Sequence, residues 1–126
     1  MPENDALTIA RAYHDAWTSM RFDEATALLA DGLEVEVPIN DYPTTESFAE
    51  GLRGFGAMTR SVELLSAMSA GNEAMLLYDM EVDGLGIMRV VEHFTVRDGR
   101  IARIRQIHDT AVLRAAGFAG PAERVA

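Results

Sequence analysis

Apolar positions recur with a helical period in the first third of the chain. Residues 6–20 carry apolar side chains at steps of three and four, which predicts an amphipathic helix. Asn4 or Asp5 precedes this stripe and is expected to cap the first turn. A shorter helix is predicted over 23–32, and alternating apolar and acidic residues predict a half-buried strand over 33–37. The pattern thus places two helices ahead of the first strand.

The middle of the chain predicts one more helix and a loosened connection. Thr44 or Thr45 is placed to begin a helix that runs past Phe48 and Leu52. Three glycines lie near the end of this segment, and we expect them to loosen the backbone before strands begin. They form no phosphate-binding loop, because they follow a helix instead of a strand.

The second half of the chain has the two-residue period of β-strands. Gly or Asp-Gly turn signals separate the extended runs, and such short connections predict an antiparallel meander. The four predicted strands are 62–70, 73–82, 86–97 and 100–108.

The order of elements predicts one α+β domain that spans residues 1–126. After the strands, a short helix is expected over 110–116, ended by Gly117, and a frayed tail over 118–126. N-terminal helices packed on a strongly curved antiparallel sheet would bury the apolar faces of both layers. Such a sheet encloses a space, and the residues that line this space decide the function.

Composition removes several classes of function. Twenty acidic residues against eleven basic ones give a net charge of −9, which disfavours binding to nucleic acid. Cysteine and lysine are absent, which excludes thiolate catalysis and Schiff-base chemistry on a lysine side chain. No apolar run approaches the roughly 20 residues of a membrane helix, and no secretion signal begins the chain. We therefore expect a cytoplasmic protein that contacts no membrane.

Several short motifs follow one another along the chain: Ala16-Trp17-Thr18-Ser19, Phe22-Asp23-Glu24-Ala25, Leu28-Leu29-Ala30-Asp31, Val35-Glu36-Val37-Pro38, Glu92-His93-Phe94 and Asp98-Gly99-Arg100-Ile101. With these motifs the chain resembles the nuclear transport factor 2-like superfamily, in its SnoaL-like and ketosteroid-isomerase-like branch, from about Leu7 to about Leu113. The resemblance implies a cystatin-like cone whose pocket holds a small, largely apolar molecule. It also implies a homodimer formed through the sheet.

Under this resemblance, Tyr13 lies where steroid isomerases place the tyrosine that stabilises an oxyanion. Glu92 lies where they have an aspartic acid that stays protonated and donates a second hydrogen bond, and it is one methylene longer. Val37 replaces the aspartate that shuttles the proton, and a valine accepts no proton. A steroid-isomerase mechanism is therefore not expected.

Strand alternation independently supports an inward position of Glu92, while the resemblance places His108 at an aromatic pocket position of the isomerases. Val90, Glu92 and Phe94 share one face of their strand, so a carboxyl lies among apolar side chains and needs a partner or a proton. A structural carboxylate bonded to an arginine is the alternative. His108 shares a face with Gln106, and we expect it to pair with Glu92 as base, acid or ligand anchor. A histidine bonded to a backbone carbonyl is the alternative there.

Four further titratable residues receive structural interpretations. His14 lies at the edge of the first apolar stripe and is expected to be partly exposed, and His93 lies on the face opposite Glu92. Asp79 is expected to pair with a strand arginine, and a role as the missing base stays open because the inward face of its strand is undecided. Asp109 is expected to cap the following turn. The spacing of the three histidines predicts no metal site.

Two main functions fit these residues. The first is a small enzyme of isomerase or cyclase type without cofactor, in which Tyr13 and Glu92 donate hydrogen bonds to a carbonyl and His108 moves a proton. The second is a non-catalytic protein that binds a hydrophobic metabolite, and a third is an interaction module that dimerises through a face bearing Val91 and Ile107. Inward residues that are expected to line the pocket are Trp17, Val37, Phe48, Phe55, Met58, Tyr78, Met80, Val90, Phe94 and Gln106.

Overall fold

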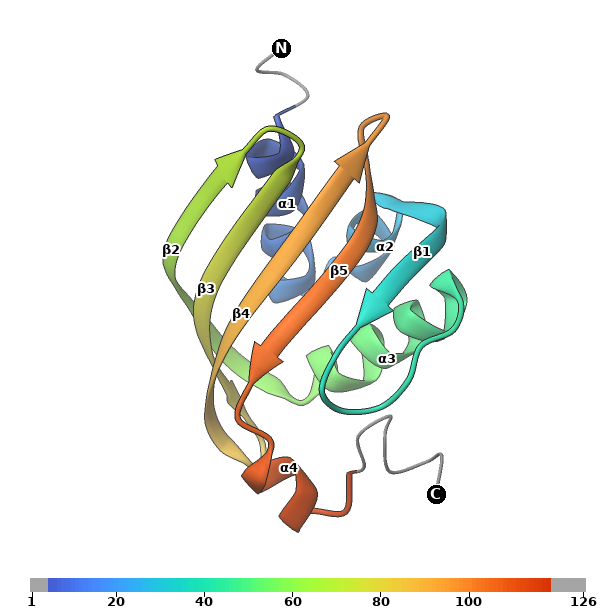
Figure 1. The fold of residues 1–126 in the computed structure, drawn as a ribbon. Helices are drawn as coiled ribbons and strands as arrows, with labels where there is room; N and C mark the ends of the chain where they lie inside the picture. The colour runs from blue at the N-terminus through green and yellow to red at the C-terminus, as the bar shows by residue number, and fades with distance from the viewer. Residues whose placement is uncertain (1–4, 119–126) are drawn as a thin grey trace.

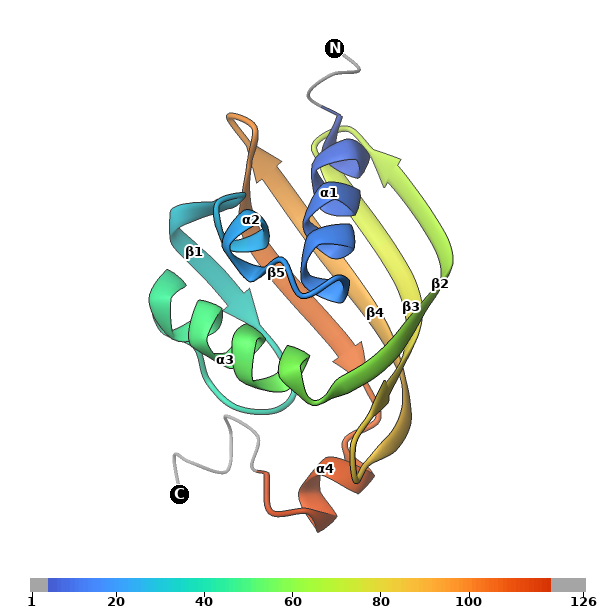
Figure 2. The same ribbon diagram turned by 180° about the vertical axis from the view of Figure 1, so that it is seen from behind.

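A computed structural model describes residues 5–118 as helices packed on one strongly curved sheet (Figure 1). Figure 2 shows that the first three helices all lie on the same, concave face of the sheet. The helices are α1 (Ala6–Thr18), α2 (Phe22–Thr26), α3 (Thr45–Ala57) and α4 (Ala111–Ala115). The strands are β1 (Leu29–Glu36), β2 (Thr59–Ala70), β3 (Glu73–Val82), β4 (Gly86–Arg97) and β5 (Arg100–His108).

The sheet is mixed, with strand order β1-β5-β4-β3-β2. Strands β2 to β5 form the predicted antiparallel meander, whereas β1 runs parallel to β5. The prediction of an α+β fold with a curved sheet is confirmed, but the expectation of a purely antiparallel sheet is wrong. Parallel neighbours need a long crossover connection, and α3 with the whole meander supplies it here.

The second predicted helix is much shorter in the structure. Helix α2 ends at Thr26, and Leu29 already begins β1, so the expected helix over 23–32 is wrong. Gly32 has φ of +73°, and the register of β1 against β5 shifts between Leu29 and Glu34, as at a β-bulge. A glycine with positive φ also ends many helices, which explains the wrong prediction.

The third helix is longer than predicted. Thr44 caps it, with its hydroxyl accepting the Ser47 N–H, and the helix continues through its glycines to Ala57. The expected loosening there is wrong, because two of these glycines allow close packing. A Cβ on Gly51 or on Gly56 would lie 2.6 Å from a ring carbon of Tyr42 or Phe22, respectively. Strand β2 then begins at position 59 instead of 62.

Burial follows the predicted periods in α1 and in the meander. The Asp5 carboxylate caps α1 by accepting the Leu7 N–H at 3.1 Å, while Asn4 lies outside the described residues. Within β3 and β4 alternate residues are buried, so the concave face forms one core with α1. No helix within residues 5–118 is long and apolar enough to cross a membrane.

The C-terminal end of the described chain packs back on the domain. Helix α4 is followed by Gly117, with φ of +101°, as predicted. Phe118 donates its N–H to the Leu113 carbonyl at 3.0 Å and packs its ring edge-on against Phe55. The expected frayed tail is therefore wrong for position 118, and its remainder, 119–126, lies outside the described residues.

Candidate active site

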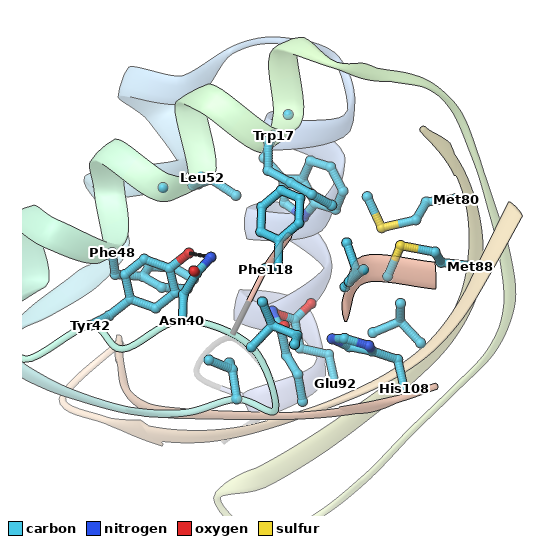
Figure 3. Close-up of a pocket in the computed structure, with 18 of the residues that line it drawn as sticks. Trp17, Asn40, Tyr42, Phe48, Leu52, Met80, Met88, Glu92, His108 and Phe118 are labelled. Atoms are coloured by element: carbon cyan, nitrogen blue, oxygen red, sulfur yellow. Dashed lines mark hydrogen bonds between the residues drawn. The ribbon is translucent and has the colours of Figure 1, made fainter. Parts of the chain in front are cut away.

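A cavity lies between the concave face of the sheet and helices α1 and α3, at the end of the sheet near α4 (Figure 3). The space between its walls, its mouth included, amounts to about 720 Å³. Tyr13, Glu92 and His108, the three predicted catalytic residues, all lie on its wall. Other predicted lining residues that also lie there are Trp17, Val37, Phe48, Phe55, Tyr78, Met80, Val90 and Gln106.

Two predicted lining residues lie elsewhere. Met58 follows the last turn of α3 and is 39% exposed, so it faces solvent instead of the cavity. Phe94 points inward as its strand period requires, but it is fully buried and packs edge-on against Tyr13 at 5.7 Å. It belongs to the solid core beside the cavity. Strand period identifies the inward face, whereas the position of α1 decides which inward residues are covered.

Glu92 is the charged group at the centre of the site. Its side chain is only 1% exposed, and each carboxylate oxygen accepts one hydrogen bond at 2.9 Å. Tyr78 Oη donates to Oε1, and Gln106 Nε2 donates to Oε2. Register brings these three residues together, because β4 lies between β3 and β5, and Gln106 is directly opposite Glu92. No arginine is bonded to the Glu92 carboxyl among the described residues.

The surroundings of Glu92 place its titration near neutrality. Burial raises the pKa of this carboxyl from 4.5 to about 7, because the charged form loses its hydration. The hydrogen bonds from Gln106 and Tyr78 act in the opposite direction, since they stabilise the carboxylate. Loss of hydration is the larger effect. Glu92 therefore exchanges between acid and base forms in the range where acid–base catalysts work.

Two buried tyrosines face this carboxyl. Burial raises the pKa of Tyr13 and of Tyr78 well above the usual value, and the negative charge of Glu92 raises both further. Each tyrosine therefore keeps its proton at neutral pH and acts as a hydrogen-bond donor. Tyr78 already donates to Glu92, whereas Tyr13 lies on the cavity wall without a hydrogen bond to another residue of 5–118.

His108 lies on the same wall, but the predicted pairing of His108 with Glu92 is not formed. It is opposite Val90, one inward position along from the Glu92–Gln106 pair, so the amide of Gln106 takes the predicted place of the imidazole. His108 Nδ1 instead bonds with the Asp109 carbonyl oxygen at 3.0 Å. A carbonyl only accepts, so Nδ1 carries the hydrogen of this bond, and in a singly protonated imidazole Nε2 is then the acceptor. Figure 3 shows the ring pointing into the cavity.

Sequence reasoning missed a group of cavity residues that come from loops and the C-terminal segment. Asn40 and Tyr42 follow β1, and Asn40 Nδ2 donates to Tyr42 Oη at 3.1 Å. Leu113 of α4 and Phe118 also reach the wall. The sequence signal for this group is weak and consists of the asparagine at position 40 in a loop. Asn40 adopts a positive φ of 69°, a backbone conformation that asparagine tolerates better than most residues.

The other two histidines lie outside the cavity wall. His14 is 3% exposed, with its ring 4.9 Å from that of Tyr78 and 5.8 Å from that of Trp17, so the expected partial exposure is wrong. Burial lowers its pKa. His93 lies on the convex face, as predicted, where its Nε2 is 2.7 Å from a carboxylate oxygen of Glu73.

The remaining predicted carboxylates have structural partners. Asp79 forms two hydrogen bonds with Arg89, at 2.7 and 2.9 Å, on the convex face, and these lower its pKa. The prediction that Asp79 pairs with a strand arginine is therefore confirmed. Its position on the convex face does not support the alternative role as a base in the cavity. Asp109 caps α4 by accepting the Ala111 N–H at 2.9 Å, as predicted. No three His, Asp or Glu side chains within 5–118 are grouped to hold a metal ion.

The model of the SnoaL-like domain family matches residues 10–104. The chain belongs to this SnoaL-like family. A crystal structure from Kribbella flavida is similar to this SnoaL-like domain, with 33% identity and a TM-score of 0.81 over 87% of this chain and 91% of the other. No curated protein matches the chain significantly.

More distant solved structures share only the fold. An NTF2-like protein of unknown function from Cytophaga hutchinsonii is 15% identical, with a TM-score of 0.75 over 84% of this chain and 91% of the other. A provisionally assigned polyketide cyclase from Sinorhizobium meliloti is 20% identical, with a TM-score of 0.68 over 79% of this chain and 94% of the other. The predicted superfamily is therefore confirmed, while the fold itself selects no reaction.

Proposed function

We propose that this SnoaL-like domain is a cofactor-independent enzyme of isomerase or cyclase type, which enolises a small, largely apolar carbonyl compound. The observation that carries the proposal is the Glu92 carboxyl on the wall of an apolar cavity, held by Tyr78 and Gln106. Those two donors orient it, and its burial makes it a base near neutral pH. The provisionally assigned polyketide cyclase of the same fold is consistent with this class of reaction.

The chemistry assigns one role to each side chain. Glu92 removes a proton from the carbon next to the substrate carbonyl, so that the C–H bond breaks and its electron pair becomes the enolate. Tyr13 donates a hydrogen bond to the carbonyl oxygen, where the negative charge develops. His108 Nε2 offers a second acceptor for a proton of the bound molecule. Glu92 thus becomes the base, because two donors on its oxygens favour accepting over the donor role expected from the sequence.

The test uses 2-tetralone, a bicyclic ketone, dissolved in heavy water. We expect the protein to accelerate exchange of the benzylic proton next to the carbonyl for deuterium, followed by proton NMR. Because a base works only when deprotonated, kcat/KM should rise about tenfold per pH unit below pH 7 and level off above it. Binding without exchange at any pH would favour the binding-protein function and contradict the enzyme. A pH-independent rate would contradict Glu92 as the base.

We also propose that two copies of the chain associate through the convex face of the sheet. Leu77, Val91 and Ile107 lie side by side across β3, β4 and β5, and Ile107 is 70% exposed. Charges of both signs flank this apolar row, including Glu73 and Arg105. A two-fold axis through such a face can set each acidic group against a basic group of the second copy.

An arginine in the apolar row should separate the copies. Ile107→Arg places a charge at the centre of the proposed interface, and we expect the dimer to become a monomer in size-exclusion chromatography with light scattering. Met20→Arg is the matched control, because this exposed methionine follows α1, away from the convex face. A wild-type monomer, or a dimer that survives Ile107→Arg, would contradict this interface.

A further inference from the structure

The cavity contains a second polar group that the proposed reaction does not use. This Asn40–Tyr42 pair comes from the loop after β1, where Asn40 Nδ2 donates to Tyr42 Oη at 3.1 Å. Figure 3 shows the pair beside Phe48, while Glu92 and His108 lie together toward the other side of the drawn cavity. The other residues of the wall are largely apolar. A ligand that fills the cavity would therefore meet polar groups at two separate places.

Three contacts hold the Tyr42 hydroxyl in one place. The ring packs edge-on against Phe48, with ring centroids 5.5 Å apart. It also lies so close to α3 that a Cβ on Gly51 would be 2.7 Å from the hydroxyl oxygen. Asn40 adopts a φ of +69°, which asparagine tolerates better than most residues, and its amide then reaches the same oxygen. The hydroxyl is thus positioned before any ligand binds.

The hydrogen-bond direction determines what this hydroxyl can offer. Its oxygen accepts the Asn40 N–H, and its own hydrogen is given to no other residue within 5–118. A phenol has one hydrogen to donate, so Tyr42 presents a donor to the cavity. An oxygen atom of a ligand is the natural acceptor, because leaving this donor unpaired in an apolar site costs free energy.

We propose that Tyr42 is a second anchoring residue, which selects elongated, largely apolar substrates that carry an acceptor oxygen at the end opposite the reacting carbonyl. This inference rests on the proposed function, because it assumes that the reacting carbonyl lies between Tyr13 and Glu92. The substrate class is then a flat or extended hydrocarbon framework with an oxygen function at both ends. Asn40 acts here as a positioning residue, because its amide holds the Tyr42 hydroxyl oxygen.

Two naphthols of equal shape test the proposal by isothermal titration calorimetry. 6-Methoxy-2-naphthol carries an ether oxygen where 6-ethyl-2-naphthol has a methylene, and both share a hydroxyl that mimics the enol of 2-tetralone. We expect the wild-type protein to bind the methoxy compound about fivefold more tightly, as one neutral hydrogen bond allows. Tyr42→Phe should abolish this preference and leave the affinity for the ethyl compound unchanged.

A second variant keeps the hydroxyl but moves it. Gly51→Ala places a methyl group against the Tyr42 ring, so the preference should again disappear although the tyrosine is intact. Equal binding of the two naphthols to the wild type, or a preference that survives Tyr42→Phe, would overturn the inference and leave the proposed function standing. Failure of both compounds to bind the wild type would instead overturn the proposed function, and this inference with it.

Discussion

The Glu92→Gln variant should lose the ability to exchange the proton of 2-tetralone, with kcat/KM falling by about 10²- to 10⁴-fold. The amide has nearly the shape of the protonated carboxyl: its oxygen can accept from Tyr78, and its NH2 group can donate to Gln106 once that side-chain amide turns to present its oxygen. It cannot accept the substrate proton at any pH near neutrality. Affinity for 2-naphthol should stay within a few-fold of the wild type, because the apolar wall is unchanged. Exchange by NMR and binding by calorimetry measure the two effects separately.

A matched substitution on the same sheet controls for the loss of a negative charge. Glu81→Gln removes an exposed carboxylate from β3 on the convex face, and it should leave exchange and binding unchanged. Glu92→Asp keeps a carboxyl but withdraws it by one methylene, so activity should be partial. If Glu92→Gln retained wild-type exchange, the proton would be taken by another group, and His108 would be the next candidate.

The titration of Glu92 alone should lower the free energy of unfolding of the wild-type protein by about 3 kcal/mol as the pH rises from 4 to 8. The carboxyl has a pKa of about 7 in the folded chain and 4.5 when hydrated. Between these values the unfolded chain releases the proton while the folded chain keeps it. The stabilising contribution is therefore complete below pH 4.5 and is lost as pH rises through about 7.

The Glu92→Gln variant has no such titration. Its free energy of unfolding should match that of the wild type near pH 4 and exceed it by up to about 3 kcal/mol at pH 8. Urea denaturation of both proteins across this range measures the difference, in which all other titrating groups cancel. A difference that does not change with pH would mean that Glu92 is ionised throughout, which contradicts its proposed titration near neutrality.

The loss of activity and the gain in stability have the same origin, which is the placement of a carboxyl in a buried, largely apolar environment. The group that makes the folded protein less stable at neutral pH is the group that removes the proton in the proposed reaction. A more stable but inactive Glu92→Gln variant would show that the cavity retains this residue for its chemistry.

The sequence by itself determined the strand faces and the class of fold. A two-residue period is a local property of an extended chain, so Val90 and Glu92 had to share a face whatever packed on it. The short turns of the meander likewise left little choice of partner for β3, β4 and β5. The inward carboxyl and the α+β order could therefore be predicted from local patterns, while the place of Tyr13 on the cavity wall was implied by the resemblance to steroid isomerases.

Only the tertiary structure decided which of these groups meet. Gln106 and His108 share one face of β5, and the register against β4 places the amide instead of the imidazole opposite Glu92. The parallel position of β1 and the approach of Tyr42 and Phe118 also depend on contacts between segments far apart in the chain. Local periodicity carries no information on such contacts, because register and packing are set by all the segments together.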